Sequence, residues 1–228
     1  MKIQRFFIKE SIAPEKTVEV FDKDLAHQIR KVFRKREGDI VGLLDNSGKG
    51  FEASVSDFGK DSVSFDVSNV SLNCFVPEKE LWIYVCIPKK DKFELVVEKA
   101  TELGVSHIVP VLSERTEKQN INIERIERII KEASEQSERG KLPVLHESIE
   151  IENIPEDICV LHMEGKSFAD SGIKEKKIVK VLIGPEGGLG EKDFSVFKEK
   201  NIEIVSLGKQ VLRAETASIA ICSLILLN

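Results

Sequence analysis

Two glycine-containing loops near the end of the chain have the residue types and spacing of a ligand site. Residues 184–188 are Gly-Pro-Glu-Gly-Gly and follow the apolar run 179–183, and a second loop around Gly208 comes about 20 residues later. A glycine has no Cβ, so its amide and carbonyl groups can approach a bound molecule closely. Because each loop follows a short strand-like run, we expect both loops to border one pocket.

The glycine spacing differs from that of two nucleotide-binding motifs. A P-loop requires G-x-x-x-x-G-K-[ST], whereas Gly208-Lys209 is followed by Gln210 and lacks the upstream glycine. A Rossmann fingerprint requires G-x-G-x-x-G after the first strand of its unit, and these loops match neither that spacing nor that place in the chain. Nucleotide-phosphate and dinucleotide binding are therefore disfavoured.

A tight strand-to-helix turn without a ligand is the alternative explanation of residues 184–190. Four glycines in seven residues, with the rigid Pro185 near the start, exceed what such a turn needs. Gly190 takes the expected N-cap position of the next helix, where serine or threonine would be stronger. This composition favours a backbone shaped for close approach as well as for turning.

The part of the chain before about residue 72 predicts a small β domain. Residues 51–57 and 63–68 alternate between apolar and polar side chains, and residues 46–50 have a composition typical of a hairpin turn. One helix interrupts the strands, and its predicted apolar face comprises Leu25, Ile29, Val32 and Phe33. We expect a small antiparallel barrel with one helix.

From Leu81 onward the chain alternates between strand and helix patterns. The expected strands are 82–87, 107–112, 158–162 and 179–183, and the expected helices include 93–104, 122–139 and 214–227. This order predicts a mainly parallel sheet with helices on both faces. The apolar pattern is interrupted near residues 72–80, so we place two domains at 1–72 and 73–228.

The last predicted helix, 214–227, is apolar on nearly every face. A helix without a polar face must be buried on all sides. We therefore expect a charge at Ile221 to be severely destabilising.

Composition excludes several classes of protein and site. The net charge of −5 argues against non-specific nucleic-acid binding by the whole chain. The four cysteines and four histidines are too scattered for a metal cluster, so we expect no metal site. The N-terminus lacks the apolar core of a signal peptide, and the most apolar stretch, 217–227, is too short to span a bilayer. We expect a cytoplasmic protein with no membrane contact.

A basic run lies directly after the apolar helix face of the first domain. Residues 30–36 contain five cations, although residues 1–76 as a whole carry 12 basic and 12 acidic side chains. Such runs are usually solvated helix surface, but this one is a local concentration on a neutral domain. With Arg5 nearby in sequence, we expect it to contact an RNA backbone, and Lys89 and Lys92 to extend the same track.

Several motifs together resemble one family. They are the loop 184–188, the segment 207–217 (Leu-Gly-x-x-Val-Leu-Arg-Ala-Glu-Thr-Ala), residues 98–105 (Glu-Lys-Ala-Thr-Glu-Leu-Gly-Val) and the pattern Glu-Gln-Ser-x-Arg at 135–139. With the small β domain that carries His27 and the basic run, the chain resembles the RsmE family of the SPOUT methyltransferases over nearly its whole length.

The resemblance implies a fold, an activity and partners. The implied fold is an α/β SPOUT domain with a C-terminal trefoil knot, a rare exception among proteins, and a small N-terminal PUA-like β-barrel domain that binds RNA. The implied activity is S-adenosylmethionine-dependent methylation of N3 of a uridine in 16S ribosomal RNA of the small subunit. The family also implies a homodimer, in which the helix 214–227 passes through the knot and packs against the second subunit.

The resemblance also assigns roles to individual residues. The expected cofactor-binding residues are Leu161, Met163, Glu164, Ile183, Gly184, Pro185, Gly187, Gly188, Leu207, Gly208, Val211, Leu212, Thr216 and Ala217. The expected RNA-binding residues are Arg5, His27, Arg30, Arg34, Arg36, Lys89 and Lys92. One departure from the family is Leu189-Gly190, where relatives often carry an aromatic residue and a serine, and this puts the capping of the next helix in question.

Methylation at N3 requires loss of a weakly acidic proton and stabilisation of the resulting charge. Arg213 is the first candidate to stabilise charge on the uracil oxygens, and Glu186 or Glu215 could accept the proton, directly or through water. Equally, Glu215 could be a first-turn helix charge, and Glu186 could cap a backbone amide. Two other functions stay open: a SPOUT enzyme that methylates a ribose 2′-hydroxyl or another base, and a non-catalytic ribosome-assembly factor of the same fold.

Overall fold

The computed structural model describes residues 3–88, 90–116 and 121–227. The chain divides into two compact units, one comprising Met1–Val76 with Ser134–Leu142 and the other comprising Pro77–Ala133 with Pro143–Asn228. The predicted boundary is a single cut, whereas the first unit also takes in a segment from the middle of the chain. None of the helices in the described residues has the length and apolar composition to cross a bilayer.

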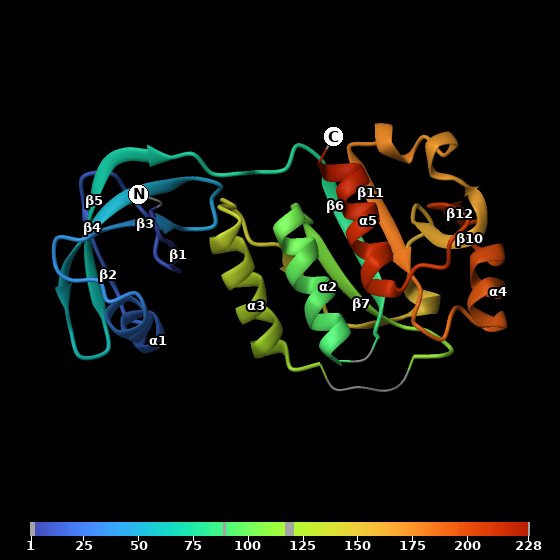
Figure 1. Ribbon diagram of the computed structural model, residues 1–228, viewed down its shortest axis with the longest axis horizontal. Coiled ribbons are helices and arrows are strands. Elements are labelled where there is room, and N and C mark those ends of the chain that lie inside the picture. The colour runs from blue at the N-terminus through green and yellow to red at the C-terminus, as the bar shows by residue number, and fades with distance from the viewer. Residues whose placement is uncertain (1–2, 89, 117–120, 228) are drawn as a thin grey trace. The chain divides into compact units, whose positions relative to one another are not determined.

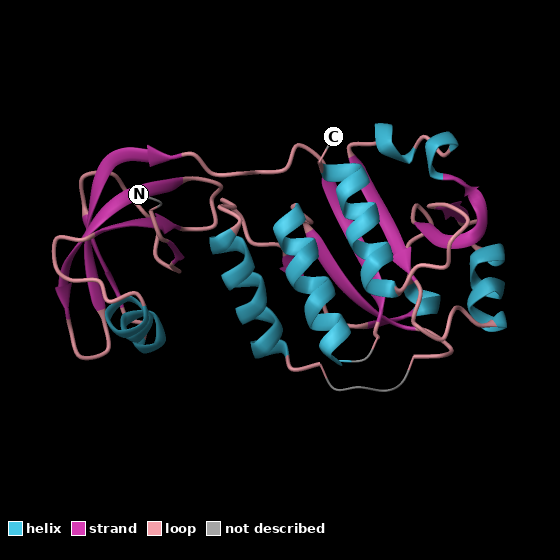
Figure 2. Cartoon of the chain, viewed as in Figure 1, coloured by secondary structure: helices cyan, strands magenta, loops and turns pink. Residues whose placement is uncertain are grey.

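The first unit is built on one five-stranded sheet in the order β1-β3-β4-β5-β2. Figure 2 shows its strands in magenta. Its strands are β1 (Arg5–Phe7), β2 (Thr17–Val20), β3 (Ile40–Leu44), β4 (Gly50–Phe58) and β5 (Val63–Leu72). The predicted hairpins pair β3 with β4 and β4 with β5 in antiparallel fashion, but β1 pairs with β3 in parallel. Because β1 and β2 form the two edges, the sheet is a half-barrel, and the expectation of an antiparallel barrel is corrected accordingly.

The helix of this unit contains a π-helical turn that the sequence did not reveal. The helix α1 (Lys23–His27) continues as η1 (Gln28–Val32), and the Phe33 amide donates to the Gln28 carbonyl at 2.9 Å, five residues back. The wider turn rotates Val32 out of the predicted apolar face, so that it is 63% exposed. Phe33, also predicted for this face, stays on it and packs edge-on against Phe6, with ring centroids 5.3 Å apart.

The segment from the middle of the chain is held in the first unit by buried polar contacts. The helix α3 (Ile123–Gln136) ends three residues before Arg139, the predicted end, and Glu138 adopts a left-handed conformation with φ of 62°. The buried Glu135 carboxylate accepts a hydrogen bond from the Phe7 amide at 2.9 Å, and Arg139 is only 2% exposed. Residues 135–139, quoted above for the family resemblance, therefore have a structural role in this unit.

The second unit is built on a parallel sheet in the order β12-β10-β11-β6-β7-β8, with β9 also paired to β7 (Figure 1). Its strands are β6 (Glu80–Cys86), β7 (His107–Leu112), β8 (Val144–Leu145), β9 (Ile149–Glu150), β10 (Cys159–Ser167), β11 (Ile178–Ile183) and β12 (Glu203–Ser206). The predicted parallel α/β arrangement is confirmed. The strand β10 runs five residues beyond its predicted end at residue 162, with an irregularity between Leu161 and Lys166.

Helices cover both faces of this sheet. The helices α2 (Lys90–Leu103) and α5 (Ala214–Leu226) lie side by side, and α5 also contacts β6 and β11 (Figure 1). On the other face, Phe197 of α4 (Glu191–Glu199) belongs to a buried cluster with Leu182 of β11. The layers therefore leave the carboxyl ends of the strands as the edge where loops can form a site.

Burial of α5 can be tested at Ile221, which is fully buried. We expect Ile221→Asp to lower the free energy of unfolding by more than about 4 kcal/mol, because an unpaired carboxylate would enter an apolar core. The matched change Ile221→Val should cost only about 1 kcal/mol. Urea denaturation followed by the fluorescence of Trp82, the single tryptophan, measures both. Similar costs for the two variants would contradict the burial of α5.

Candidate active site

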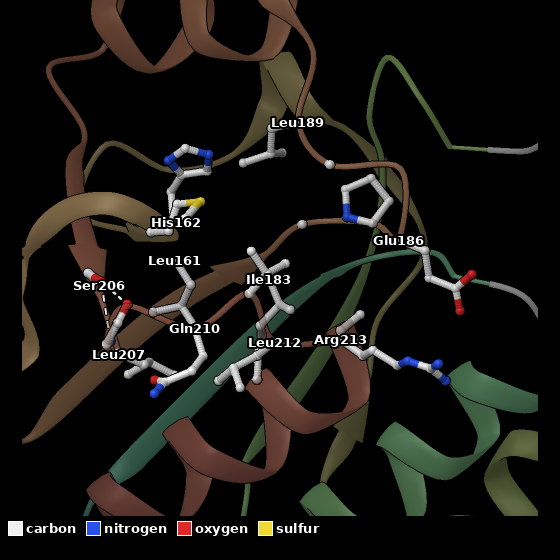
Figure 3. A pocket seen from close by; sticks show the side chains of 18 of the residues that line it. Leu161, His162, Ile183, Glu186, Leu189, Ser206, Leu207, Gln210, Leu212 and Arg213 are labelled. Atoms are coloured by element: carbon white, nitrogen blue, oxygen red, sulfur yellow. Dashed lines mark hydrogen bonds between the residues drawn. The ribbon is translucent and has the colours of Figure 1, made fainter.

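Loops from three neighbouring strands meet around one cavity. The strand β10 pairs with both β11 and β12 in parallel, so the segments that follow these strands emerge at the same edge of the sheet. Residues 184–189, residues 206–214 and the irregular part of β10 surround a cavity of about 630 Å³ (Figure 3). This volume lies within the range of small-molecule sites.

Most of the predicted cofactor-binding residues line this cavity. Those on its wall are Leu161, Met163, Ile183, Gly184, Pro185, Gly188, Leu207, Gly208, Val211, Leu212 and Ala217. Glu164, Gly187 and Thr216 are not among the lining residues. The sequence prediction that both glycine loops border a single pocket therefore agrees with the geometry.

The cavity has two chemically different ends. Figure 3 shows the side chains of Glu186 and Arg213 at one end, and Ser206, Leu207 and Gln210 at the other. Lys92 also lines the cavity, whereas Glu215 does not. A ligand with an uncharged, flat part and a reacting part can therefore meet uncharged groups at one end and charged groups at the other.

Five lining residues were not predicted as site residues, namely His162, Leu189, Ser206, Gln210 and Ala214. Ser206 closes the second loop on itself, because its Oγ donates to the Gly208 carbonyl at 2.9 Å and accepts from the Gly208 amide at 3.2 Å. Gln210 follows in the same loop, and His162 packs its ring edge-on against Phe194 at 5.1 Å. A serine two residues before a glycine was the available signal for Ser206. His162 ends the predicted strand 158–162, and the sequence gave no separate sign of its place at the cavity.

The first glycine loop includes a backbone conformation that favours glycine. The Gly188 amide donates to the Pro185 carbonyl at 2.9 Å, which closes a tight turn. Gly188 has φ of +72°, in the left-handed region that most side chains avoid. A side chain at this position would strain the loop, and its Cβ would lie 3.8 Å from Arg115 Nη1.

A remote carboxylate caps the helix that follows this loop. Gly190, at the N-cap of α4, has no side chain to accept the free amides of the first turn. The Glu114 Oε2 accepts from the Lys192 amide at 3.0 Å, and a Cβ added to Gly190 would clash with that same carboxylate. Asp193, fully buried, accepts from the amides of Gly190 at 2.8 Å and Glu114 at 3.0 Å. Capping is therefore supplied from outside the loop, which resolves the question raised by Leu189-Gly190.

The residue after Glu114 holds the loop itself. The Arg115 guanidinium donates to the Gly187 carbonyl at 2.9 Å. Glu114 and Arg115 both lie after β7, more than 70 residues before the loop that they support. Spacing in the sequence carried no sign of either contact.

Lys92, on the cavity wall, forms an ion pair with Glu215, which lies off the wall. The Lys92 Nζ lies 2.8 Å from Glu215 Oε1. The hydrogen bond from Lys92 lowers the pKa of the Glu215 carboxyl, and the charge of Arg213 contributes in the same direction. Glu186 and Arg213 are exposed at the rim.

The predicted RNA-binding residues fall into different environments. His27, Arg30, Arg34 and Arg36 are exposed on the first unit. Arg30 lies over the ring of Phe58, with its guanidinium carbon 4.6 Å from the centroid, and donates to the Phe58 carbonyl at 3.2 Å. Lys89 lies outside the described residues.

Arg5 is a correction to the predicted RNA contacts. Its side chain is buried within the first unit, where it donates to the Asn73 carbonyl at 2.7 Å and to Glu138 Oε2 at 2.8 Å. A guanidinium with these partners is a structural group. Because it is only 9% exposed, we no longer propose that it contacts RNA.

Comparison with known proteins identifies the family. The model of the RNA methyltransferase domain family matches residues 76–226. A ribosomal RNA small subunit methyltransferase E from Synechocystis sp. is 30% identical over 224 residues, which cover 90% of this chain and 73% of that one. The chain belongs to the RsmE family of RNA methyltransferases.

Other RsmE proteins cover almost the whole chain. The Rickettsia conorii relative is 28% identical and covers 96% of this chain and 93% of its own length. The crystal structure of the Neisseria gonorrhoeae relative, bound to S-adenosyl methionine, has a TM-score of 0.87 at 25% identity, covering 97% of this chain and 96% of that one. Both units of the chain are therefore part of the RsmE architecture.

The remote cap of α4 predicts a specific compensation between two substitutions. We expect Glu114→Ala and Gly190→Ser each to lower the free energy of unfolding by about 1 kcal/mol, the first by removing the cap and the second by displacing the Glu114 carboxylate. The double variant should be more stable than the sum of the single effects, because a serine N-cap then replaces the carboxylate. Urea denaturation of the four proteins measures this coupling. Simple additivity would contradict the proposed cap.

Proposed function

We propose that this RsmE protein methylates N3 of a uridine in the 16S ribosomal RNA of the small subunit, with S-adenosylmethionine as methyl donor. The observation that supports this assignment is the cavity between the two glycine loops, which has uncharged groups at one end and charged groups at the other. The donor has the same division, with an adenosine part and a reactive sulfonium.

The residues of the cavity fit the donor. Leu161, Ile183 and Leu212 offer apolar surface for the adenine ring. The backbone at Gly184 and Gly208 can offer hydrogen bonds without steric bulk. We assign the remaining predicted cofactor-binding residues to the same site, with Glu164, Gly187 and Thr216 outside its lining.

We assign charge stabilisation and proton removal to residues at the charged end of the cavity. The uridine N3 gives its proton to a base and its electron pair to the donor's methyl carbon, whose bond to sulfur breaks with both electrons on sulfur. Arg213 stabilises negative charge on the uracil oxygens. Glu186 is the favoured base over Glu215, because Glu186 lines the cavity, whereas Glu215 lies off its wall and its pKa is lowered by the Lys92 hydrogen bond.

The finer features of the family fold are part of the same proposal. We assign the second unit a C-terminal trefoil knot and the first unit a PUA-like fold that binds RNA through His27, Arg30, Arg34 and Arg36. Homodimerisation is supported by apolar side chains that α5 leaves exposed, with Leu224 at 38% and Leu227 directly after the helix at 63%. We assign the enzyme to the cytoplasm, because the proposed substrate is made there.

One experiment tests the activity. The pure protein is incubated with labelled S-adenosylmethionine and small subunits that lack the modification, and the product is identified by nucleoside mass spectrometry. N3-methyluridine is the expected product. A 2′-O-methyl nucleoside or another methylated base would assign the protein to a different specificity, and cofactor binding without incorporation would indicate a non-catalytic assembly factor.

The position of the donor can be tested at Gly188. We expect Gly188→Val to weaken S-adenosylmethionine binding by at least about tenfold, since Gly188 lines the cavity and a valine there strains a turn with positive φ. Gly172→Val is the matched control, because Gly172 has φ of +70°, nothing within 4 Å of an added Cβ, and lies away from the cavity. Calorimetric titration with the donor measures both. Unchanged affinity in Gly188→Val would show that the donor binds elsewhere.

The RNA-binding role of the first unit can be tested through salt dependence. We expect Arg34→Ala and Arg36→Ala each to weaken binding to small subunits and to reduce the slope of log affinity against log salt by about 1, because one phosphate contact is lost. Lys16→Ala, at an exposed site of the same unit, is the control. Filter binding over a range of salt concentrations measures the slopes. Identical slopes for all four proteins would exclude a phosphate contact at this run.

A further inference from the structure

The ion pair between Lys92 and Glu215 lies at the boundary of the cavity. Lys92, near the start of α2, lines the cavity with its side chain 31% exposed, and Glu215, in the first turn of α5, is 9% exposed and does not line it. The carboxylate therefore lies between the helices, and the ammonium lies between the carboxylate and the open space.

The pair is poorly arranged for a purely structural role. Glu215 Oε2 is buried and has no hydrogen-bond partner among the described residues. A buried charge with an unpaired oxygen costs free energy, and an apolar pair of similar volume would usually stabilise the helix contact as well or better. Local departures of this kind occur mainly where function requires them.

The ammonium has donors left for a ligand. Lysine has three N–H donors, and the hydrogen bond within the described structure is the one to Glu215 Oε1. The other charged groups that line the same cavity are Arg213, on the segment before α5, and Glu186, on the loop after β11. The charged end therefore has two cations and one exposed carboxylate.

We infer that Lys92 is a second charge-stabilising catalytic residue, positioned in the cavity by Glu215, and that it binds one uracil oxygen while Arg213 binds the other. This inference rests on the proposed uridine N3 activity. Loss of the N3 proton spreads negative charge over the two carbonyl oxygens that flank N3, so two cations match the charge better than one. The lowered pKa of Glu215 agrees with a carboxylate that stays ionised and holds the lysine in place.

This role differs from the RNA-backbone contact predicted from the sequence. A lysine that contacts phosphate needs a free, solvated ammonium, whereas Lys92 is paired with a buried carboxylate at the wall of the cavity. A phosphate contact and a catalytic role also predict different experimental effects. A phosphate contact changes the affinity for RNA and its salt dependence. A cation beside the reacting uracil ring changes kcat and the pH dependence of kcat.

The experiment compares the pH dependence of kcat in Lys92→Met, Lys92→Arg and the wild-type protein, with unmodified small subunits as substrate. We expect Lys92→Met to lower kcat at neutral pH by about 10- to 100-fold. The kcat of this variant should recover at higher pH, because loss of the cation raises the pKa of the uridine N3 in the complex by about one to two units. Lys92→Arg should restore part of the rate. For both Lys92 variants, calorimetric titration should give an affinity for S-adenosylmethionine within about threefold of the wild-type value.

Two further variants separate the roles. Glu215→Gln, which keeps an oxygen acceptor for Lys92, should lose less activity than Lys92→Met and show the same recovery at high pH. Lys198→Met, at an exposed site of α4, controls for loss of a surface charge and should behave as wild type. If Glu215→Gln is inactive at every pH, Glu215 is the base and the positioning role is wrong.

The remaining outcomes are also decisive. A fall in kcat that is equal at all pH values in Lys92→Met, or a change in KM alone that depends on salt, would overturn the catalytic role. Failure of the proposed function would appear differently, as a wild-type protein that binds the donor and forms no N3-methyluridine.

Discussion

The carboxyl ends of neighbouring parallel strands leave a sheet at the same edge, and the candidate site depends on this constraint. The register makes the point concrete: Leu161 of β10 pairs with Ile183 of β11 on one side and with Val205 of β12 on the other. Segments far apart in the sequence therefore start from the same level of the sheet. The two glycine loops and the irregular part of β10 therefore converge at this edge, and Ser167 at the end of β10 pairs with Ser206 at the start of the second loop.

Loops poor in side chains need support from elsewhere. A glycine-rich segment has high conformational entropy in the unfolded chain and few contacts of its own. In this protein the support comes from Glu114 and Arg115, which bind the start of α4 and the Gly187 carbonyl. The space left by the missing Cβ of Gly190 is filled by the Glu114 carboxylate. The loop thus offers exposed backbone to a ligand, and Glu114 and Arg115, from another part of the chain, hold that backbone in place.

Charged residues of similar type have very different roles in this fold. Arg5, Glu135 and Arg139 are buried in the first unit and stabilise it. Arg34 and Arg36 are exposed on the same unit and are free to meet a partner. The difference follows from burial, since a guanidinium removed from water must find a protein acceptor. Residue type alone does not separate these cases.

The sequence by itself determined the parallel α/β unit, the β-rich unit, the two glycine loops that border one cavity, and the family. Those features depend on periodicity and on local motifs: β7 was predicted at His107–Leu112 and forms there. Only the tertiary structure decided the outward turn of Val32, the capping of α4 by Glu114, and the pairing of Lys92 with Glu215. The last two contacts join residues 78 and 123 positions apart. Neither spacing nor propensity carries information about such pairs, because they form only when the sheet register brings distant segments together.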